Sequence, residues 1–562
     1  MYRNILVLII LTLTTSNVLC QNLILNIYGK TNQETQIIDT IGYQNTHTNF
    51  KSILNSIDTL GIKLGKLGYL EHEIKSSKKL NDSTVETLIN LNKKFNYIYI
   101  RYNLETINED ILNPYTTNTG KHLLKIEFND LEYTLQSLNA KLAEHGLPFT
   151  TLKLEDIKIE NDSVIAKLKT SQEEKARHLD IIVIKGYEKF PKKFIKYYSK
   201  LKKDNLFNMT NILKQTNQIN KLTFANLIRD PEVLFTKDST TLYIYVEKQK
   251  SNNFDGYIGF ATNEDTNKLE FSGYVDMLFR NNLNYGETLK LLYRSDESEQ
   301  KTFNVNIDVP YIFNTPIGTD LELNIFKKDS TFSTVDQSLK LYYQINPAHK
   351  IFAGLSSTQS SNLLETTTNS TINDYKSTFY QFEYNFINTA IENTFFPTKS
   401  YANIETGFGP RTYENTKENQ ILINTELYHT FYLNYNNSIF SRLTAGVLHS
   451  DSFLENELLY FGGINSIRGF EENSLTANLY SVLNLEYRYQ LNSTMYINTI
   501  TDFSYFENKI SLLKEKLISF GVGFALFTNA GLLKLIYANG KTEKQPFSID
   551  NAKIHLSLTT SF

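Results

Sequence analysis

The chain of 562 residues has no tryptophan, four methionines, ten prolines and a single cysteine, Cys20. One cysteine excludes a disulfide framework within the chain. After the first twenty residues there is no run of about 18 apolar residues, which excludes a membrane-spanning helix. Barrel strands need only about 9 to 11 alternating residues each to cross a membrane, so a membrane role stays open.

Motifs of catalysis are missing as well. The sequence contains no GxSxG, Walker loop, HExxH or CxxC pattern, and its nine histidines are scattered. Glycines inside the segments 407–411 and 521–524 indicate close backbone approach and not phosphate binding. The net charge of -3 gives no case for a nucleic-acid partner. We therefore expect a protein that is not an enzyme and has no cofactor, metal or nucleic acid.

Aromatic residues are abundant, with 36 tyrosines and 36 phenylalanines. Such residues favour strands and membrane interfaces. The first 20 residues have a different character: Arg3 precedes an apolar run over 5–13, and small and polar residues follow. This order predicts a secretory signal peptide that is cleaved after Cys20. The alternative is a lipid anchor on Cys20, which the bulky Leu19 disfavours.

The N-terminal half combines helical and strand patterns in a loosely repeated order, β-α-α-β-β. We place the first repeat at 22–104. Residues 23–29 alternate like a strand, helical spacing follows over 34–67, and 71–74 and 96–103 are predicted to close the unit as strands.

The third repeat, at 180–250, shows the same order clearly. The second repeat, at 120–178, is predicted to be degenerate at its start, although its helix and two alternating strands are recognisable. Repeats of this size each need a small hydrophobic core of their own.

From 253 to 562 the pattern changes to short alternating strands separated by Asn, Gly, Asp and Ser. About 310 residues at about 19 per strand and connection predict an all-β transmembrane barrel of 16 antiparallel strands. In the last strand, one face is expected to meet lipid and the other the lumen. The lipid-facing residues include Ile554, Leu556, Leu558 and Phe562.

The segment 461–470, FGGINSIRGF, places one positive charge between glycines. It is either an exposed loop tip or a charged plug inside the barrel. The glycines give the backbone room to double back, and a guanidinium in a partly dehydrated lumen requires a carboxylate partner. The residues of this motif are Gly462, Gly463, Ile467, Arg468, Gly469 and Phe470.

The three repeats resemble POTRA domains, the periplasmic modules that precede certain outer-membrane barrels. The C-terminal half resembles the BamA/TamA superfamily of outer-membrane assembly and translocation proteins, also called the bacterial surface-antigen family. The segments that carry this second resemblance, in chain order, are 281–295, 308–318, 393–409, 455–475, 484–491, 499–506 and 521–540.

The resemblance implies that Arg468 lies at the tip of the sixth extracellular loop, folded back into the lumen against Glu486 and Asp502. It also implies a protein of the Gram-negative outer membrane with its repeats in the periplasm. The implied partners are unfolded outer-membrane proteins, periplasmic or lipoprotein accessory subunits, and outer-membrane lipid.

Three classes of function remain open. An insertase would use a seam between the first barrel strand, near 256–262, and the last, at 552–562. A translocator of the two-partner secretion type usually has two repeats and a plug helix, whereas this chain is expected to start directly on a repeat. A plain porin or adhesin would need neither repeats nor the RGF motif. With three repeats, the chain is closer to the TamA type than to the family's principal assembly factor, which usually has five repeats.

Overall fold

The computed structural model describes residues 22–103, 109–112, 122–160, 163–171, 175–263, 268–295, 300–364, 371–389, 393, 395–544, 547 and 552–561. The predicted signal peptide and Phe562 lie outside these residues. No described helix is long and apolar enough to cross a membrane. The chain forms two compact units, which are Met1–His178 with Leu206–Thr210, and Leu179–Asn205 with Asn211–Phe562.

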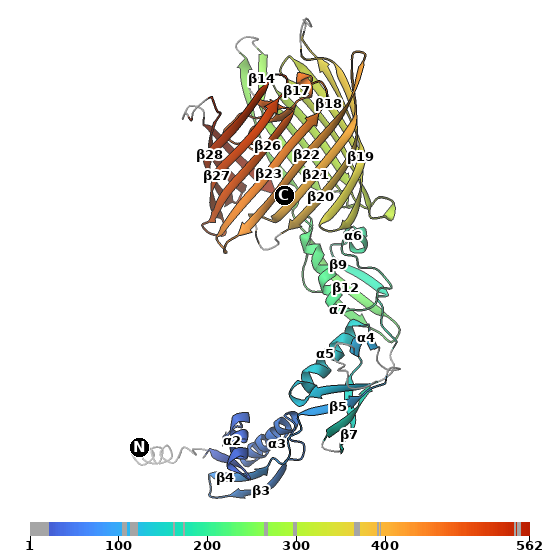
Figure 1. Ribbon diagram of the computed structural model, residues 1–562, viewed down its shortest axis with the longest axis vertical. Helices are drawn as coiled ribbons and strands as arrows, with labels where there is room; N and C mark the ends of the chain where they lie inside the picture. Colours follow the sequence, from blue (N-terminus) through green and yellow to red (C-terminus); the bar gives the residue numbers. More distant parts are fainter. Residues whose placement is uncertain are drawn as a thin grey trace, which may run out of the picture. The chain divides into compact units, whose positions relative to one another are not determined.

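The first repeat is a four-stranded sheet in the order β2-β1-β4-β3, with β1 and β4 parallel (Figure 1). Helix α3 packs on it through a buried stripe at Ile53, Ile57, Leu60 and Leu64, which recur at helical spacing. Asn49 caps this helix by accepting from the backbone N–H of Ser52 at 2.9 Å. The elements are β1 (Leu23–Gly29), α2 (Asn32–Ile41), β2 (Thr46–His47), α3 (Phe50–Lys66), β3 (Glu73–Lys79) and β4 (Thr84–Asn90).

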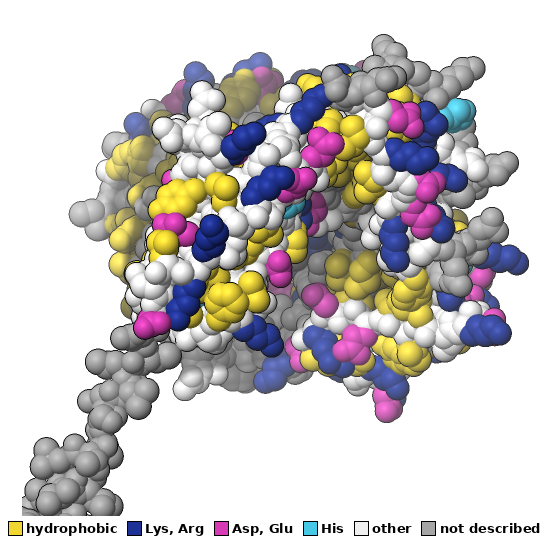
Figure 2. Space-filling view, turned by 90° about the horizontal axis from the view of Figure 1, so that it is seen from below, with side chains coloured by type: hydrophobic (Ala, Val, Ile, Leu, Met, Phe, Trp, Pro, Cys, Tyr) yellow, Lys and Arg dark blue, Asp and Glu magenta, His cyan; other side chains and the backbone are white. Residues whose placement is uncertain are grey.

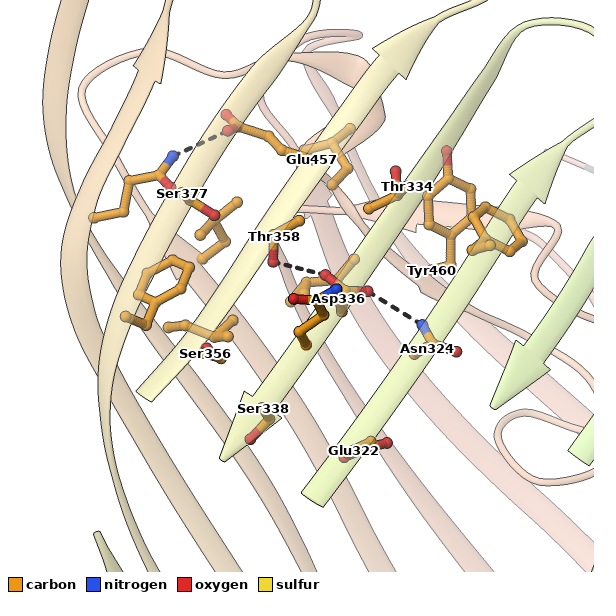
Figure 3. Close-up of a pocket in the computed structure, with 18 of the residues that line it drawn as sticks. Glu322, Asn324, Thr334, Asp336, Ser338, Ser356, Thr358, Ser377, Glu457 and Tyr460 are labelled. Atoms are coloured by element: carbon orange, nitrogen blue, oxygen red, sulfur yellow. Dashed lines mark hydrogen bonds between the residues drawn. The ribbon is translucent and has the colours of Figure 1, made fainter. Parts of the chain in front are cut away.

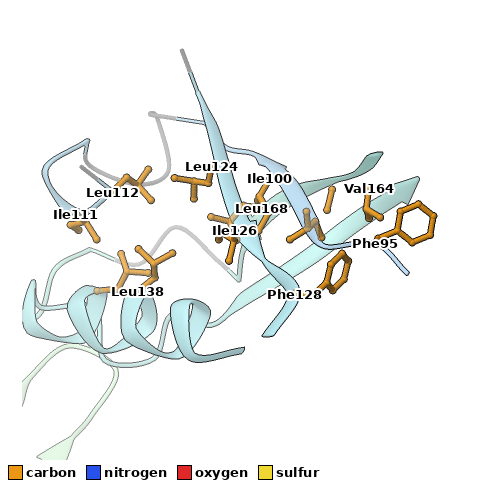
Figure 4. Close-up of a cluster of buried hydrophobic side chains, with 13 residues drawn as sticks. Phe95, Ile100, Ile111, Leu112, Leu124, Ile126, Phe128, Leu138, Val164 and Leu168 are labelled. Carbon is orange, nitrogen blue, oxygen red and sulfur yellow. The ribbon is translucent and has the colours of Figure 1, made fainter. Parts of the chain in front are cut away.

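The second repeat is a sheet in the order β6-β5-β8-β7. Its core brings Ile100, Leu124 and Val164 from the sheet against Leu138 of helix α5 (Figure 4). The elements are β5 (Tyr97–Arg101), α4 (Glu109–Leu112), β6 (Leu123–Glu127), η2 (Phe128–Asp130), α5 (Leu131–Glu144), β7 (Leu152–Glu160) and β8 (Ser163–Thr170).

The prediction that 96–103 closes the first repeat is wrong. Strand β5 pairs with β8, in the register Ile98↔Val164, and with β6. The strand that completes the first sheet is β4, which the sequence reading missed. The second repeat is therefore not degenerate at its start, because its first strand had been assigned to its neighbour. Alternation identifies a strand but not the sheet to which it belongs.

The third repeat is a smaller sheet in which β12 is central. It pairs with β9 in parallel and with β10 and β11 in antiparallel orientation. The elements are β9 (Ile181–Gly186), α6 (Lys193–Tyr197), α7 (Met209–Thr216), η3 (Asn217–Lys221), β10 (Ala225–Leu227), β11 (Glu232–Phe235) and β12 (Thr240–Lys248).

A closed barrel of 16 antiparallel strands follows, which confirms the predicted fold and strand number. Its strands are β13 (Asn253–Asn263), β14 (Lys268–Arg280), β15 (Thr288–Ser295), β16 (Lys301–Val309), β17 (Ile317–Lys328), β18 (Phe332–Asn346), β19 (His349–Asn362), β20 (Tyr375–Thr389), β21 (Thr398–Tyr413), β22 (Thr416–Tyr432), β23 (Asn437–His449), β26 (Leu479–Gln490), β27 (Met495–Asn508), β28 (Leu513–Thr528), β29 (Gly531–Lys541) and β30 (Lys553–Ser561).

Strand β18 shows why the barrel suits a membrane. Leu339, Leu341 and Tyr343 are about half exposed, whereas the intervening Lys340 and Tyr342 are buried. Successive residues of a strand point to opposite faces, so the apolar set faces outward and the polar set faces the lumen.

The lumen contains polar side chains that bind one another. Around a cavity of about 450 Å³, Asp336 accepts hydrogen bonds from Asn324 at 3.1 Å and from Thr358 at 2.6 Å (Figure 3). Such pairing lowers the cost of placing polar groups inside the barrel. On the surface, Figure 2 shows Lys and Arg side chains interspersed with Asp and Glu, in keeping with the small net charge.

The third repeat is joined to the barrel by an aromatic contact. Tyr311, in the turn between β16 and β17, is 1% exposed and packs edge to face against Phe194 with the ring centroids 4.9 Å apart. Tyr197 stacks on the Tyr311 ring, and Lys193 Nζ donates to the Tyr311 carbonyl at 3.1 Å. These contacts fix helix α6 to that end of the barrel.

Candidate functional site

Loop 6 is the connection 450–478 between β23 and β26. It follows the hairpin connections β13 to β14, β15 to β16, β17 to β18, β19 to β20 and β21 to β22, so it is the sixth on its side of the barrel. Its two arms pair as a small sheet in the register Leu459↔Ala477. Its short elements are η5 (Glu455–Glu457), β24 (Leu459–Phe461) and β25 (Leu475–Ala477).

Arg468 points into the wall of the barrel and binds both predicted acidic residues. Its Nε and Nη2 donate to the two carboxylate oxygens of Asp502 on β27, at 2.9 and 2.5 Å. Its backbone N–H donates to the same carboxylate at 3.0 Å, and Nη1 donates to Glu486 on β26. The side chains of Arg468 and Asp502 are 6% and 0% exposed. This forked geometry is the strong form of a charge-assisted hydrogen bond.

A second arginine, Arg488, completes the cluster. Its Nε donates to Glu486 at 2.7 Å, so two arginines face two carboxylates. Burial by itself lowers the pKa of Arg468, but the hydrogen bonds and charges of Asp502 and Glu486 outweigh it and raise that pKa. The sequence reading missed Arg488, although it stands two residues from Glu486 and thus on the same strand face.

The neighbours of Arg468 pack the loop tip against the wall. Ile467 is completely buried in a cluster with Phe461, Val482 and Phe506. Gly469 has a φ of +86°, and a Cβ on it would lie 2.6 Å from the backbone nitrogen of Gly540 in β29. Only glycine fits here without moving the strand.

The lipid-facing residues predicted for the last strand lie on one face of β30. Ile554, Leu556 and Leu558 are 69%, 62% and 41% exposed. Lys553 and Thr559 lie on the opposite face, where Lys553 contacts loop 6 and Thr559 Oγ1 donates to Asp255 at 2.9 Å.

Arg411 on β21 fastens the first arm of loop 6 on the other flank of β23, and the sequence reading missed this role. It is fully buried and donates to Glu457 of loop 6 and to Glu418 of β22, both at 2.6 Å. The pair Arg411↔Glu418 follows from the hairpin register of β21 and β22. No signal in the sequence indicates Glu457, because the contact joins residues 46 positions apart that share no strand ladder.

The seam between β13 and β30 is the shortest ladder of the barrel. Three residue pairs join them, from Asn253↔Ser561 to Asp255↔Thr559, whereas every other barrel ladder has at least seven. No pairing with β30 is described for 256–263, nor with β13 for 553–558.

Among the described residues, no group of His, Cys, Asp and Glu could hold a metal ion.

A closed barrel with an apolar outer face and a polar lumen, preceded by three mixed sheets, defines a barrel protein of the outer membrane with POTRA-like repeats in the periplasm. The chain belongs to the Omp85 superfamily. The family model, described as the Omp85 superfamily domain, matches residues 215–562. This confirms the resemblance seen in the sequence.

Solved structures share the fold. BamA from Haemophilus ducreyi lacking POTRA domains 1-3 is 14% identical, with a TM-score of 0.51 over 82% of this chain and 99% of that chain. CdiB from Acinetobacter baumannii is 12% identical, with a TM-score of 0.52 over 82% and 89%. CdiB from Escherichia coli is 11% identical, with a TM-score of 0.53 over 91% and 98%. No curated protein matches the chain.

Proposed function

We propose that this protein is an outer-membrane assembly factor that receives unfolded barrel precursors on its periplasmic repeats and inserts them through the seam between β13 and β30. The observation that carries the proposal is the three-pair seam. Along 256–263 and 553–558, backbone N–H and C=O groups face the seam without a ladder partner among the described pairs. Unpaired strand edges accept an added strand, and in lipid they must be satisfied.

Two further features support this function. Members of the Omp85 superfamily transport or assemble proteins, which fits a chain without a catalytic motif. The outer strands β3, β7 and β11 each pair on one side only in the described sheets, so the repeats offer edges to an extended segment. Backbone pairing of this kind tolerates many client sequences.

Reconstitution in lipid vesicles tests the seam directly. Register partners Phe254 and Thr560, both changed to cysteine, would lock the seam when oxidised. We expect the locked protein to lose acceleration of precursor folding and to regain it on reduction. A matched pair within an ordinary ladder, Ile325→Cys with Val335→Cys, should leave the rate unchanged. A locked protein that inserts precursors at the normal rate would contradict the proposal.

Export of one partner protein through the lumen is the alternative function. Loop 6 is held at β27 by Arg468 and contacts β17 through Tyr460 and Phe326, whose ring centroids are 5.1 Å apart, so it crosses the lumen. An obstructed lumen favours insertion through the seam. Depletion of the protein followed by outer-membrane proteomics separates the two. Broad loss of barrel proteins supports an insertase, and loss of a single secreted protein supports a translocator.

A further inference from the structure

We call the pairing of Arg468 with Asp502 and Glu486 the latch. Two adjacent acidic residues follow it in loop 6, and each binds a different barrel strand. Glu471 pairs with Lys553 of β30, with 2.9 Å between the carboxylate and Nζ. Glu472 pairs with Arg294 of β15, with 2.5 Å between the carboxylate and Nη1. One short stretch of loop 6 therefore contacts two strands that are far apart in the chain.

The two contacted strands lie on opposite sides of the seam. Around the closed barrel the strand order runs β29, β30, β13, β14, β15. Arg468 to Phe470 lie against β26 to β29, Glu471 binds β30, and Glu472 reaches past β13 and β14 to β15. The loop thus follows the inner wall in strand order and crosses the seam between its two glutamates.

The crossing lies where the backbone ladder has ended. Asp255 is the last residue of β13 that pairs with β30. Arg294 is in register with Tyr274, which is in register with Tyr257, beyond that point. Lys553 lies at the other end of β30 from Thr559, the partner of Asp255. Side chains of loop 6 therefore bridge a part of the seam that has no described ladder.

The crossing contacts are more hydrated than the latch. The side chains of Arg294 and Glu472 are each 27% exposed and line a cavity of about 890 Å³, whereas Asp502 is fully buried. Partly exposed ion pairs are weak and screened by salt, but buried forked pairs are not easily broken. Gly463 leaves space for the Glu472 side chain, because a Cβ on Gly463 would lie 1.9 Å from the Glu472 carboxylate.

We propose that Glu472 and Arg294 form a breakable clasp across the seam, anchored on the near side by Glu471 and Lys553. The clasp holds β13 and β30 together while Arg468 keeps loop 6 in place. Opening of the seam breaks the hydrated Glu472 pair and leaves the buried Arg468 pair intact. A role of the clasp in admitting clients rests on the proposed function. The clasp as a contact between barrel strands does not depend on that function.

Hydrogen exchange of the full chain in lipid nanodiscs, without a client, tests the clasp. Glu472→Gln and Arg294→Gln should each speed exchange of the amides in 253–255 and 559–561, which form the seam ladder, by about two- to fivefold, the effect of a partly exposed pair. High salt should speed exchange in the native protein and have little effect in either variant. Glu132→Gln, which breaks the exposed pair with Lys66, is the control and should change nothing at the seam.

Exchange at the native rate in both single variants, or no response of the native protein to salt, would overturn the clasp. The charge-swapped double variant, Glu472→Arg with Arg294→Glu, should restore slow hydrogen exchange at the seam. Hydrogen exchange as fast as in the single variants would overturn the pairing. Precursor insertion is measured separately. If the native protein inserts no precursor while Glu472→Gln still loosens the seam, the proposed function fails and the clasp stands.

Discussion

At the scale of single residues, the site depends on buried charges that compensate one another. Asp502 accepts three hydrogen bonds from Arg468 and has no solvent exposure. Removing one partner of a buried pair leaves the other charge without compensation, which costs about 3 to 5 kcal/mol. The same deletion in an exposed pair costs about 0 to 1 kcal/mol.

We therefore expect Arg468→Ala to loosen loop 6 and impair activity while the protein still reaches the outer membrane. Proteolysis within 450–478 should become faster, and the midpoint for loss of the heat-modifiable gel band should fall. Lys66→Ala, at a pair with both side chains 58% exposed, is the control and should leave both readouts unchanged. Full complementation of a deletion strain by Arg468→Ala would refute the role of the latch.

Gly469→Ala should also weaken the loop, for a steric reason. The left-handed backbone costs a residue with a Cβ about 1 to 2 kcal/mol, and the added carbon would meet the backbone of β29 at 2.6 Å. Faster hydrogen exchange in loop 6 would report the strain. Gly65→Ala, whose Cβ would have nothing within 4 Å, should leave loop 6 exchange at the native rate. Equal behaviour of the two variants would contradict this account.

At the scale of elements, alternation and helical spacing predicted much of the fold, but not the pairing of strands. The buried stripe of α3 and the alternation of β18 are local patterns, so the sequence shows them. The strand at Tyr97–Arg101 was found but placed in the wrong repeat, because its partners at Leu123–Glu127 and Ser163–Thr170 come later in the chain.

Helix α3 provides a prediction at this scale. Asn49→Ala removes the side chain that accepts from Ser52, which should destabilise the first turn by about 1 kcal/mol. Amide exchange in that turn should become about fivefold faster. Asn49→Asp retains an acceptor and should exchange at nearly the native rate. Equally fast exchange in both variants would show that the cap does not contribute.

At the scale of the whole molecule, the second compact unit contains all that the barrel needs to close. The sixteen strands, loop 6 and the joint at Phe194 and Tyr311 all belong to it. The first two sheets have separate hydrophobic cores, in which Leu25 and Ile100 are completely buried. Folding of the barrel should therefore be independent of those sheets, whereas client capture should not.

Deletion of residues 22–170 tests this independence. The shortened protein should form the heat-modifiable barrel with a midpoint within a few degrees of the native one, and should lose most of its acceleration of precursor folding. Tyr311→Ala in the full chain is the comparison, because it retains all three repeats and removes the barrel-side ring that Phe194 and Tyr197 contact. Failure of the shortened chain to form a barrel would show that the two units fold together.

The alternating residues after 253 were enough to predict a barrel and, with the length, its strand number, because period and span are local properties of a chain. The resemblance led to Arg468, Glu486 and Asp502. Only the closed structure revealed the contacts from Arg411 to Glu457 and from Glu472 to Arg294. The first joins loop 6 to a strand two away from the one it leaves, and the second crosses the seam, and such neighbours exist only after the loop has folded in and the sheet has closed upon itself.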